Sequence, residues 1–289
     1  MVRHTFNWGS KTYIMGIINM SPESFSGDGF DNVNEAITHA KNLVNDGADM
    51  LDIGGKSTRP HTSTFVEDQI GGNKSTNDLR KVDRDEELRR VIPLITKLKS
   101  EVSVPISIDT YDVEVGRQAL VAGATVINDI WGLKADPKLA RVAAEHDAQL
   151  VIMHNQKDTL YTNLVSEIKM SLMNSVEIAR KAGVAKENIV LDPGFGFGKL
   201  PNQNLQVLRR LNELKALGFP ILVGTSNKST IGSVLDLPID KRIEGTSATV
   251  AISIANGADI VRVHDVKTMS LVSKMTDAVI RYRRSEGDG

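Results

Sequence analysis

Eight short apolar segments of the chain each end at a polar side chain that can bind a ligand or carry charge. One such residue is explained by a helix cap or a turn, because Asp and Asn commonly fill both roles. Eight at equivalent positions predict instead one polar site to which every segment contributes. In chain order the residues are Asn19, Asp52, Asp109, Asn128 with Asp129, His154, Asp192, Ser226 with Lys228, and Arg262 with His264.

The cationic members of this set fit a phosphate. Lys228, Arg262 and His264 follow the last two apolar segments. Arg can bind two phosphate oxygens at once, and His adds a further donor. Residues 262 and 264 are two positions apart, so on a strand their side chains face the same side. This pattern predicts an anionic group at this part of the site.

The carboxylates and the amide fit a different part of a ligand. Asp52, Asp109, Asn128 and Asp192 come from the other segments. Groups of this kind spread around a pocket suit a flat heterocycle with several N–H donors and a carbonyl. The residue types therefore indicate a substrate in which a donor-rich ring carries an anionic leaving group. His154 fits either a ligand contact or a hydrogen-bonded histidine of the core.

The apolar segments have the composition of buried strands, and the stretches between them have helical periodicity. The predicted strands are Thr12–Met20, Ala48–Gly55, Pro105–Thr110, Val126–Trp131, Gln149–Asn155, Ile189–Gly194, Pro220–Ser226 and Asp259–Asp265. Apolar residues at three- and four-residue spacing predict helices over Asn34–Asp46, Asp85–Glu101, Leu164–Ala182 and Leu205–Leu217. Glycines are expected to end helices at Gly47, Gly123, Gly183, Gly218 and Gly257.

This alternation of strands and helices predicts parallel βαβ units. An open doubly wound sheet usually has a glycine-rich turn after its first strand, and Gly16 and Gly29 do not form one. Eight units over this length match a (β/α)₈ TIM barrel, whose active site lies at the C-terminal ends of the strands and whose phosphate site commonly follows strands seven and eight. We expect an α/β protein with a single barrel domain over residues 1–289.

Composition narrows the function further. The 35 basic and 36 acidic residues nearly cancel, which argues against nucleic acid as a partner. The chain has no Cys, so disulfides and thiol catalysis are excluded and a reducing compartment is favoured. No apolar run is long enough to span a membrane. We expect a cytoplasmic protein that acts on small molecules.

Six motifs lie at the predicted strand ends, namely Met15–Ser26, Asp52–Pro60, Ser107–Thr110, Ile127–Asp129, Asp192–Lys199 and Arg262–Val266. In residue types and in order, these motifs resemble those of the dihydropteroate synthase family. The resemblance extends from about Tyr13 to Arg284.

The resemblance implies a transferase of folate biosynthesis. Its reaction condenses 6-hydroxymethyl-7,8-dihydropterin pyrophosphate with 4-aminobenzoate and releases pyrophosphate. By resemblance, the pterin ring is held by Asp109, Asn128, Asp192 and Lys228, and the pyrophosphate by Asn19, Arg262 and His264, with Asp109, Lys228, Arg262 and His264 as the catalytic residues. The aminobenzoate pocket and the closing loops are assigned to Ser24, Phe25, Thr58, Arg59, Pro60, Phe197 and Ser229.

The resemblance also implies Mg²⁺, bound through Asn19 and phosphate oxygens, and a homodimer packed through outer helices. The chemistry fits a dissociative substitution, because a preorganised pocket can stabilise the pterin cation and the leaving pyrophosphate together. The amine of 4-aminobenzoate is weakly basic and already neutral at pH 7, so no strong general base is needed.

The sequence departs from the family pattern at three places. Asn227 stands where the family normally has Arg, and Asn supplies neither the charge nor the fork of a guanidinium. Lys56 replaces a frequent Glu, at a position expected to tolerate change. The polar stretch His61–Asp83 predicts an extended loop insertion. It is either a neutral surface insertion or, together with Asn227, a change in selectivity between 4-aminobenzoate and sulfonamides.

Two other functions stay open at this point. A methyltetrahydrofolate-dependent methyltransferase would share the ring-binding residues, but it needs a corrinoid partner and no pyrophosphate site. The cationic group Lys228, Arg262 and His264 argues against it. The second alternative is a non-catalytic pterin-binding relative, supported only by Asn227.

Overall fold

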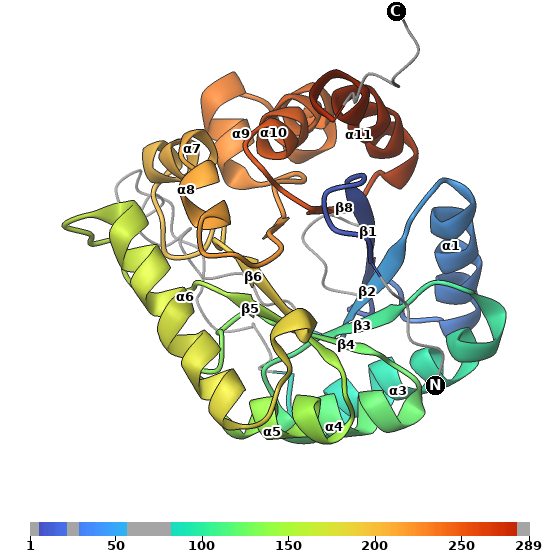
Figure 1. The fold of residues 1–289 in the computed structure, drawn as a ribbon. Helices are drawn as coiled ribbons and strands as arrows, with labels where there is room; N and C mark the ends of the chain where they lie inside the picture. The colour runs from blue at the N-terminus through green and yellow to red at the C-terminus, as the bar shows by residue number, and fades with distance from the viewer. Residues whose placement is uncertain (1–5, 22–28, 57–81, 282–289) are drawn as a thin grey trace, which may run out of the picture.

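The strands form one parallel sheet that is nearly closed into a barrel (Figure 1). The computed structural model describes residues 6–21, 29–56 and 82–281. The strand order is β6-β5-β4-β3-β2-β1-β8-β7, and the bridge between Leu191 and Ile221 joins β6 to the start of β7. The strands are β1 Tyr13–Asn19, β2 Met50–Gly54, β3 Ile106–Asp109, β4 Val126–Asp129, β5 Gln149–Met153, β6 Ile189–Asp192, β7 Leu222–Val223 and β8 Ile260–Val263. The predicted (β/α)₈ barrel is confirmed, and each strand lies within its predicted segment.

Helices surround the strands on the outside (Figure 1). They are α1 Val33–Asn45, α3 Arg84–Glu101, α4 Val113–Ala122, α5 Lys138–Glu145, α6 Leu164–Lys181, α7 Pro201–Arg209, α8 Asn212–Lys215, α9 Ser229–Leu235, α10 Ile243–Ala255 and α11 Val266–Ile280. Short 3₁₀ turns at Lys186–Asn188 and Ile239–Lys241 complete the connections. The five glycines expected at helix ends all have positive φ.

The prediction of one helix over Leu205–Leu217 is wrong, because the chain forms α7 and α8 with a break at Arg210 and Leu211. The leucines of this stretch recur strictly every three residues. An α-helix with 3.6 residues per turn would rotate such a series away from the core. The backbone instead tightens, with i to i+3 hydrogen bonds such as Leu214 N to Leu211 O at 2.9 Å. Leu211 and Leu214 are fully buried as a result.

Alternation along the strands separates two cores. Residues that face outward, such as Ile108 and Ile127, pack beneath the helices. Inward-facing residues near the strand starts form a second apolar cluster inside the barrel, to which Met15, Met50 and Val126 belong. On β2, β4, β6 and β8 the next inward positions toward the C-terminal ends are polar, namely Asp52, Asn128, Asp192 and Arg262. The pleat therefore places the predicted site residues above an apolar floor.

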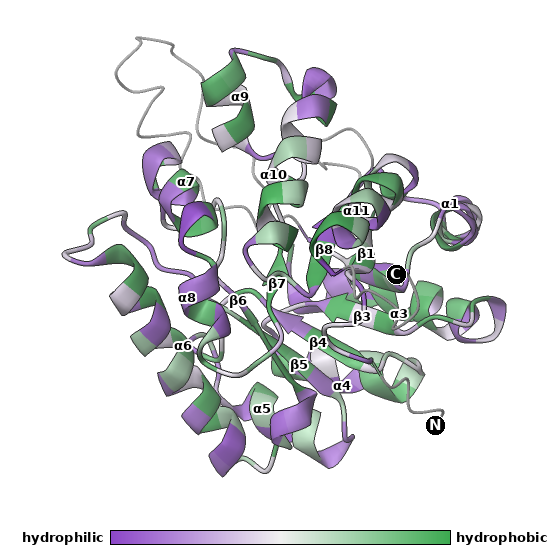
Figure 2. Cartoon of the chain, turned by 45° about the horizontal axis from the view of Figure 1, so that its top comes forward, coloured by the Kyte–Doolittle hydropathy of each residue, from purple (hydrophilic) through white to green (hydrophobic). Residues whose placement is uncertain are grey.

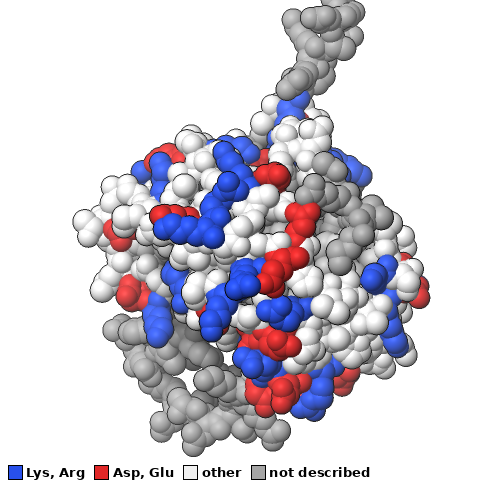
Figure 3. All heavy atoms as spheres, turned by 60° about the horizontal axis from the view of Figure 1, so that its bottom comes forward, with Lys and Arg blue, Asp and Glu red and all other residues white. Residues whose placement is uncertain are grey.

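Charges of both signs are interspersed on the outer surface, as the face in Figure 3 shows. One ion pair of the outer surface joins α4 to α5, between Arg117 and Glu145, and Glu145 also pairs with Arg141 within α5. Exposed pairs of this kind contribute little to stability. No helix among residues 6–21, 29–56 and 82–281 is long and apolar enough to cross a bilayer.

Candidate active site

Four strand ends lie in one register row at the C-terminal end of the barrel. Asn19 on β1 pairs with Gly54 on β2, Gly54 with Asp109 on β3, and Asp109 with Asn128 on β4. Gly54 has no side chain, and a Cβ built there would lie 3.8 Å from Asn19 Oδ1 and 3.9 Å from Asp109 Oδ2. The amide of Asn19 and the carboxylate of Asp109 therefore converge over Gly54.

Arg262 on β8 ties this row together from the inside of the barrel. Its Nε lies 2.6 Å from Asp52 Oδ2 and its second terminal nitrogen 3.0 Å from Asp109 Oδ2. Asn128 Nδ2 donates to the same Asp52 oxygen at 2.9 Å. The other carboxylate oxygens of Asp52 and Asp109 are buried and accept no hydrogen bond from the described residues. A ligand with N–H donors can donate hydrogen bonds to buried acceptors of this kind.

A second group forms at the ends of β6 and β7. Asp192 is buried and accepts a hydrogen bond from Gly194 N at 2.7 Å. Lys228 Nζ lies 4.1 Å from the ring centroid of Phe197, which is buried together with Met153 and packs against the half-buried Trp131. A cation over an aromatic face is stabilised by the ring quadrupole. The charge of Lys228 also acts on both Asp109 and Asp192, so the two groups belong to one site.

The acidic residues of the site have raised pKa values. Burial raises the pKa of Asp109 to about 7, against the attraction of Arg262, and the neighbouring Asp52 and Glu87 raise it further. Burial likewise raises the pKa of Asp192 to about 6, although Gly194 N–H and Lys228 oppose the shift. A dry pocket that disfavours charge also strengthens any interaction with a cationic intermediate.

His264 follows β8 and is anchored to the chain after β7. Its Nδ1 lies 2.8 Å from Ser226 Oγ, and its backbone N–H donates to the same hydroxyl at 3.3 Å. Ser229 begins α9 beside Lys228 and is exposed. Of the remaining predicted residues, Ser24, Phe25, Thr58, Arg59, Pro60 and nearly all of the 61–83 insertion lie outside the described residues.

His154 is a core histidine, one of the two interpretations left open by the sequence. It is buried, and Lys199 Nζ lies 3.0 Å from its Nδ1. Burial, helped by the charge of Lys199, lowers the pKa of His154 to about 2, so the ring is neutral and its Nδ1 accepts. Lys199 also donates to Gly194 O at 2.9 Å and Phe197 O at 3.0 Å. It thereby fixes the turn that carries Phe197.

Sequence reasoning gave no role to Lys199 or to Glu87, a buried acid on α3. Lys199 lies inside the motif Asp192–Lys199, so the sequence indicated that it lies near the site. The sequence did not indicate which groups its ammonium contacts. The expectation that Lys56 tolerates change conflicts with the structure, because Lys56 Nζ lies 2.6 Å from Glu87 Oε2. A fully buried carboxylate depends on such a partner.

Asn227 has a conformational role that the sequence pattern did not reveal. Its φ is +56°, a left-handed conformation that Asn adopts more readily than most residues. Arg242 donates to the Asn227 carbonyl at 3.0 Å, which holds the turn leading to Lys228. Asn therefore suits the left-handed backbone of this position, although it lacks the positive charge of the Arg that the family normally has here.

Comparison with known proteins places this barrel in a family. The sequence profile described as "pterin binding enzyme" matches residues 15–69 and 69–264. The dihydropteroate synthase of Bacillus subtilis is 47% identical over 275 residues, which cover 95% of this chain and 90% of that protein. The chain belongs to the pterin-binding enzymes.

The solved structures narrow the family to one activity. A dihydropteroate synthase from Clostridium difficile, solved in the presence of pteroic acid, is 51% identical with a TM-score of 0.85, over 96% of this chain and 100% of that one. The Xanthomonas albilineans synthase in complex with 7,8-dihydropteroate is 34% identical with a TM-score of 0.81, over 95% and 96%. Within the family this chain is a transferase of the dihydropteroate synthase type, as its motifs predicted.

Proposed function

We propose that the barrel mouth binds 6-hydroxymethyl-7,8-dihydropterin pyrophosphate beside 4-aminobenzoate and joins them to 7,8-dihydropteroate. The observation that carries this assignment of the site is the register row of Asn19, Asp109 and Asn128 with Arg262 across it. The bond from the exocyclic methylene to the pyrophosphate oxygen breaks, and a bond from that carbon to the amine nitrogen forms. The amine then loses its proton.

The pterin ring is assigned to Asp109, Asn128, Asp192 and Lys228. The buried carboxylates supply acceptors for the N–H groups of the ring, and the amide of Asn128 and the ammonium of Lys228 supply donors. Asp109 is assigned to the reacting end, where its carboxylate stabilises the developing pterin cation. Asp109 and Asp192 lie on β3 and β6, which are separated by β4 and β5, and this spacing suits a flat ring held by its edge.

The leaving pyrophosphate is assigned to Asn19, Arg262 and His264. Arg262 lies between two carboxylates, so its orientation is fixed before a ligand arrives and little reorganisation accompanies catalysis. The Ser226 hydroxyl holds His264 in place in a similar way. Phe197 and Ser229, with Ser24, Phe25, Thr58, Arg59 and Pro60, are proposed to surround 4-aminobenzoate.

Mg²⁺ is proposed to bind through Asn19 and the pyrophosphate oxygens. The described residues contain no group of three or more His, Cys, Asp or Glu that could hold a metal. Mg²⁺ does not need one, because it commonly uses one or two protein oxygens together with water and substrate phosphates. The Asn19 amide oxygen, which lies over Gly54 at the C-terminal end of the barrel, fits such a site. When bound, the ion would neutralise charge on the leaving group.

A homodimer is proposed to form through α9, α10 and α11. Figure 2 shows apolar residues on these helices. Leu271, Met275 and Val279 are 64%, 66% and 70% exposed and share one stripe of α11, with Ile252 of α10 also exposed. Apolar surface of this extent marks an interaction site. Sedimentation of wild type and Met275→Lys tests the assignment, and a wild-type monomer would contradict it.

We further propose that the protein is cytoplasmic and that its residues 1–289 act as a single barrel domain. We also propose that Asn227 and the 61–83 insertion alter its selectivity between sulfonamides and 4-aminobenzoate. The ratio of sulfonamide inhibition constant to aminobenzoate KM, compared between wild type, Asn227→Arg and a deletion of the insertion, tests the selectivity. An unchanged ratio in both variants would overturn it.

The assigned roles are tested by pyrophosphate release from the dihydropterin substrate with and without 4-aminobenzoate, in Mg²⁺ and in excess chelator. We expect release that requires aminobenzoate and Mg²⁺ and that falls at least about 100-fold in Asp109→Asn, because an electrostatic contact to the transition state is lost. Binding of the dihydropterin without any release would instead support the non-catalytic alternative.

A further inference from the structure

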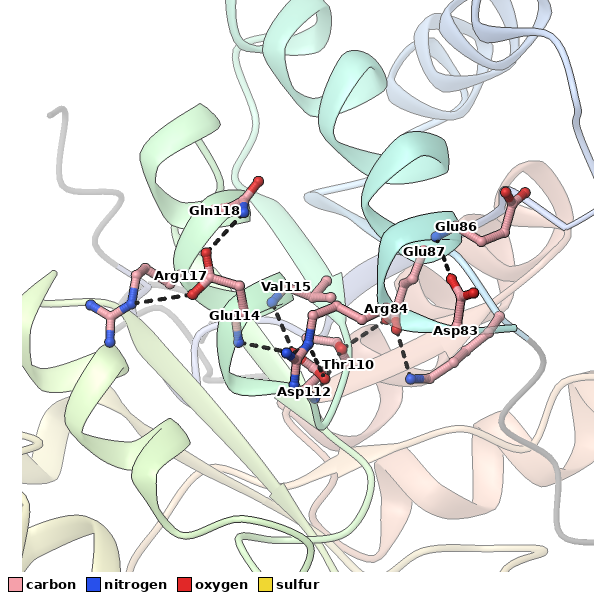
Figure 4. A network of polar contacts seen from close by, with 11 residues as sticks. Asp83, Arg84, Glu86, Glu87, Thr110, Asp112, Glu114, Val115, Arg117 and Gln118 are labelled. Atoms are coloured by element: carbon pink, nitrogen blue, oxygen red, sulfur yellow. Dashed lines mark hydrogen bonds and ion pairs between the residues drawn. The ribbon is translucent and has the colours of Figure 1, made fainter. Parts of the chain in front are cut away.

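Glu87 is a fully buried acid outside the residues assigned to substrate. It lies in the first turn of α3, where Asp83 caps the helix by accepting from Glu86 N. One carboxylate oxygen accepts a hydrogen bond from Thr110 Oγ1 at 2.8 Å, and the other lies 2.6 Å from Lys56 Nζ. Figure 4 shows the Glu87 side chain pointing from α3 toward Thr110.

Through these contacts Glu87 joins the ends of two neighbouring strands. Thr110 directly follows Asp109 at the end of β3, and Lys56 lies two residues after the end of β2. The stem of Glu87 also packs on Gly55, where a built Cβ would lie 3.0 Å from Glu87 Cγ. The contact with Thr110 therefore acts one residue away from the carboxylate of Asp109.

A neighbouring contact joins α3 to Asp112, which follows β3 and caps α4. Arg84 Nε donates to both carboxylate oxygens of Asp112 at 3.0 and 2.9 Å, and Thr110 Oγ1 accepts from Asp112 N at 3.2 Å (Figure 4). The Thr110 hydroxyl thus donates one hydrogen bond to Glu87 and accepts one from the backbone N–H of Asp112, so it acts both as donor and as acceptor. Arg84 is exposed, whereas the contact between Glu87 and Thr110 is buried.

Lys56 supplies the positive charge that faces the buried carboxylate of Glu87. The Lys56 side chain is largely buried, and its ammonium lies 4.1 Å from the Tyr111 ring centroid. Burial acts to lower the pKa of Lys56, but the Glu87 carboxylate outweighs burial, so the pKa is raised. An ionised carboxylate holds the Thr110 hydroxyl more strongly than a neutral acid would.

We propose that Glu87 is a positioning residue for Asp109, acting through the Thr110 hydroxyl, and that Lys56 is the counter-charge on which this role depends. The inference rests on the proposed function, which assigns Asp109 to the reacting end of the pterin. A shift of a reacting group by about 1 Å can lower a rate about 100-fold. Loss of the contact is therefore expected to lower kcat more than it raises either KM.

The Thr110 hydroxyl gives the sharpest test. Thr110→Val keeps the shape and removes the donor, whereas Thr110→Ser keeps the hydroxyl. We expect Thr110→Val to lower kcat at least about tenfold with KM for 4-aminobenzoate changed less than about threefold, and Thr110→Ser to retain kcat within about threefold. Unchanged kcat in Thr110→Val, or equal losses in both variants, would overturn the proposal.

The charge pair is tested in a double-mutant cycle of Glu87→Gln and Lys56→Met. Each single variant leaves one buried charge without its partner, so we expect each to lower kcat about tenfold and the double variant to lose less than the product of the two. Additive losses would overturn the role of Lys56. Arg117→Gln on α4, which removes an exposed ion pair, is the matched control with unchanged kcat.

Melting temperature and folded fraction are measured for every variant, and kcat is expressed per folded enzyme. If Glu87→Gln does not fold, the comparison of Thr110→Val with Thr110→Ser still decides the positioning role. Aminobenzoate-dependent pyrophosphate release by wild type separates this inference from the proposed function. Its absence overturns the function, whereas full turnover in wild type and in Thr110→Val overturns the positioning role alone.

Discussion

Arg262 and Asp52 form an ion pair across the barrel interior, with Nε and Oδ2 separated by 2.6 Å although the residues are 210 positions apart in sequence. Both lie on strands that flank β1, and Asp52 is fully buried. The pair fixes the Arg262 guanidinium beside Asp109, so the Arg262 side chain loses little conformational freedom when a ligand binds. The anionic and cationic parts of the site are thus one charge network.

Asp52→Asn is expected to destabilise the protein by about 3 kcal/mol, because removing one partner leaves a buried charge poorly compensated. Arg262 retains Asp109 as a partner, which keeps the loss at the lower end. Urea denaturation of the variant measures it. Arg117→Gln at the exposed pair with Glu145 serves as control and should change stability by less than about 0.5 kcal/mol. Equal losses of stability in the two variants would show that the buried ion pair contributes no more to stability than the exposed one.

The pH dependence of kcat/KM is expected to report Asp109. Burial raises its pKa to about 7, so activity that needs the carboxylate should rise as pH increases through about 7. Asp52 raises this pKa, whereas Arg262 lowers it. Asp52→Asn should therefore move the rising limb to lower pH. If the rising limb stays at the same pH in Asp52→Asn, the titration that it reports is not that of Asp109.

The same shift has a defined sign for stability. The folded-state pKa of Asp109 lies above its ordinary value of 3.8, so the folded protein binds the proton more tightly than the unfolded chain. The resulting stabilisation is fully present below about pH 4 and is lost as pH rises through about 7. The stability of wild type relative to Asp109→Asn should accordingly decline from pH 5 to pH 8 in urea denaturation. A difference that grows with pH would contradict this.

Sequence patterns predicted the architecture and the strand-end residues because both follow from local periodicity. Strand alternation alone indicates that Asp52, Asp109 and Arg262 point inward. It does not indicate that Arg262 pairs with both acids, since that depends on the register across the four strands β8, β1, β2 and β3. Glu87 was missed for a related reason. On a helix with Glu86 and Asp85 beside it, a buried acid has the same local pattern as an exposed one.

Gly194→Ala is expected to destabilise the protein by at least about 3 kcal/mol. Its φ is +69°, and a Cβ would lie 1.8 Å from the carbonyl oxygen of His154. Left-handed strain alone costs roughly 1–2 kcal/mol, and the clash with backbone adds to it. Gly9 has a φ of +89° with nothing within 4 Å of a built Cβ. Gly9→Ala therefore isolates the strain, and an equal effect in thermal melts would show that the contact is readily relieved.

Asn227→Arg is expected to lower stability by about 1 kcal/mol and to change turnover by less than about threefold. Arg adopts the left-handed backbone of this position less readily than Asn does. Asn227→Gly, which carries no such strain, should be at least as stable as Asn227→Arg. A large gain in turnover for Asn227→Arg in the pyrophosphate assay would show that the missing guanidinium had weakened the wild-type site.

Lys199→Met is expected to lower stability by about 2–4 kcal/mol. The ammonium contacts His154 Nδ1, Gly194 O and Phe197 O at 2.9–3.0 Å. The methionine side chain would leave His154 Nδ1 and Phe197 O buried without this donor, whereas Gly194 O keeps the backbone N–H of Phe197. Burial lowers the pKa of Lys199 from its ordinary value of 10.5 to about 7, so the folded protein binds this proton less tightly than the unfolded chain does. The stability of wild type should therefore rise with pH through about 7, and the loss on mutation should be larger at pH 8 than at pH 6. Lys186→Met is the matched control, because Lys186 is exposed and lies over the Phe219 ring. Urea denaturation measures the stability of both variants. Equal losses of stability in Lys199→Met and Lys186→Met would contradict the structural role assigned to Lys199.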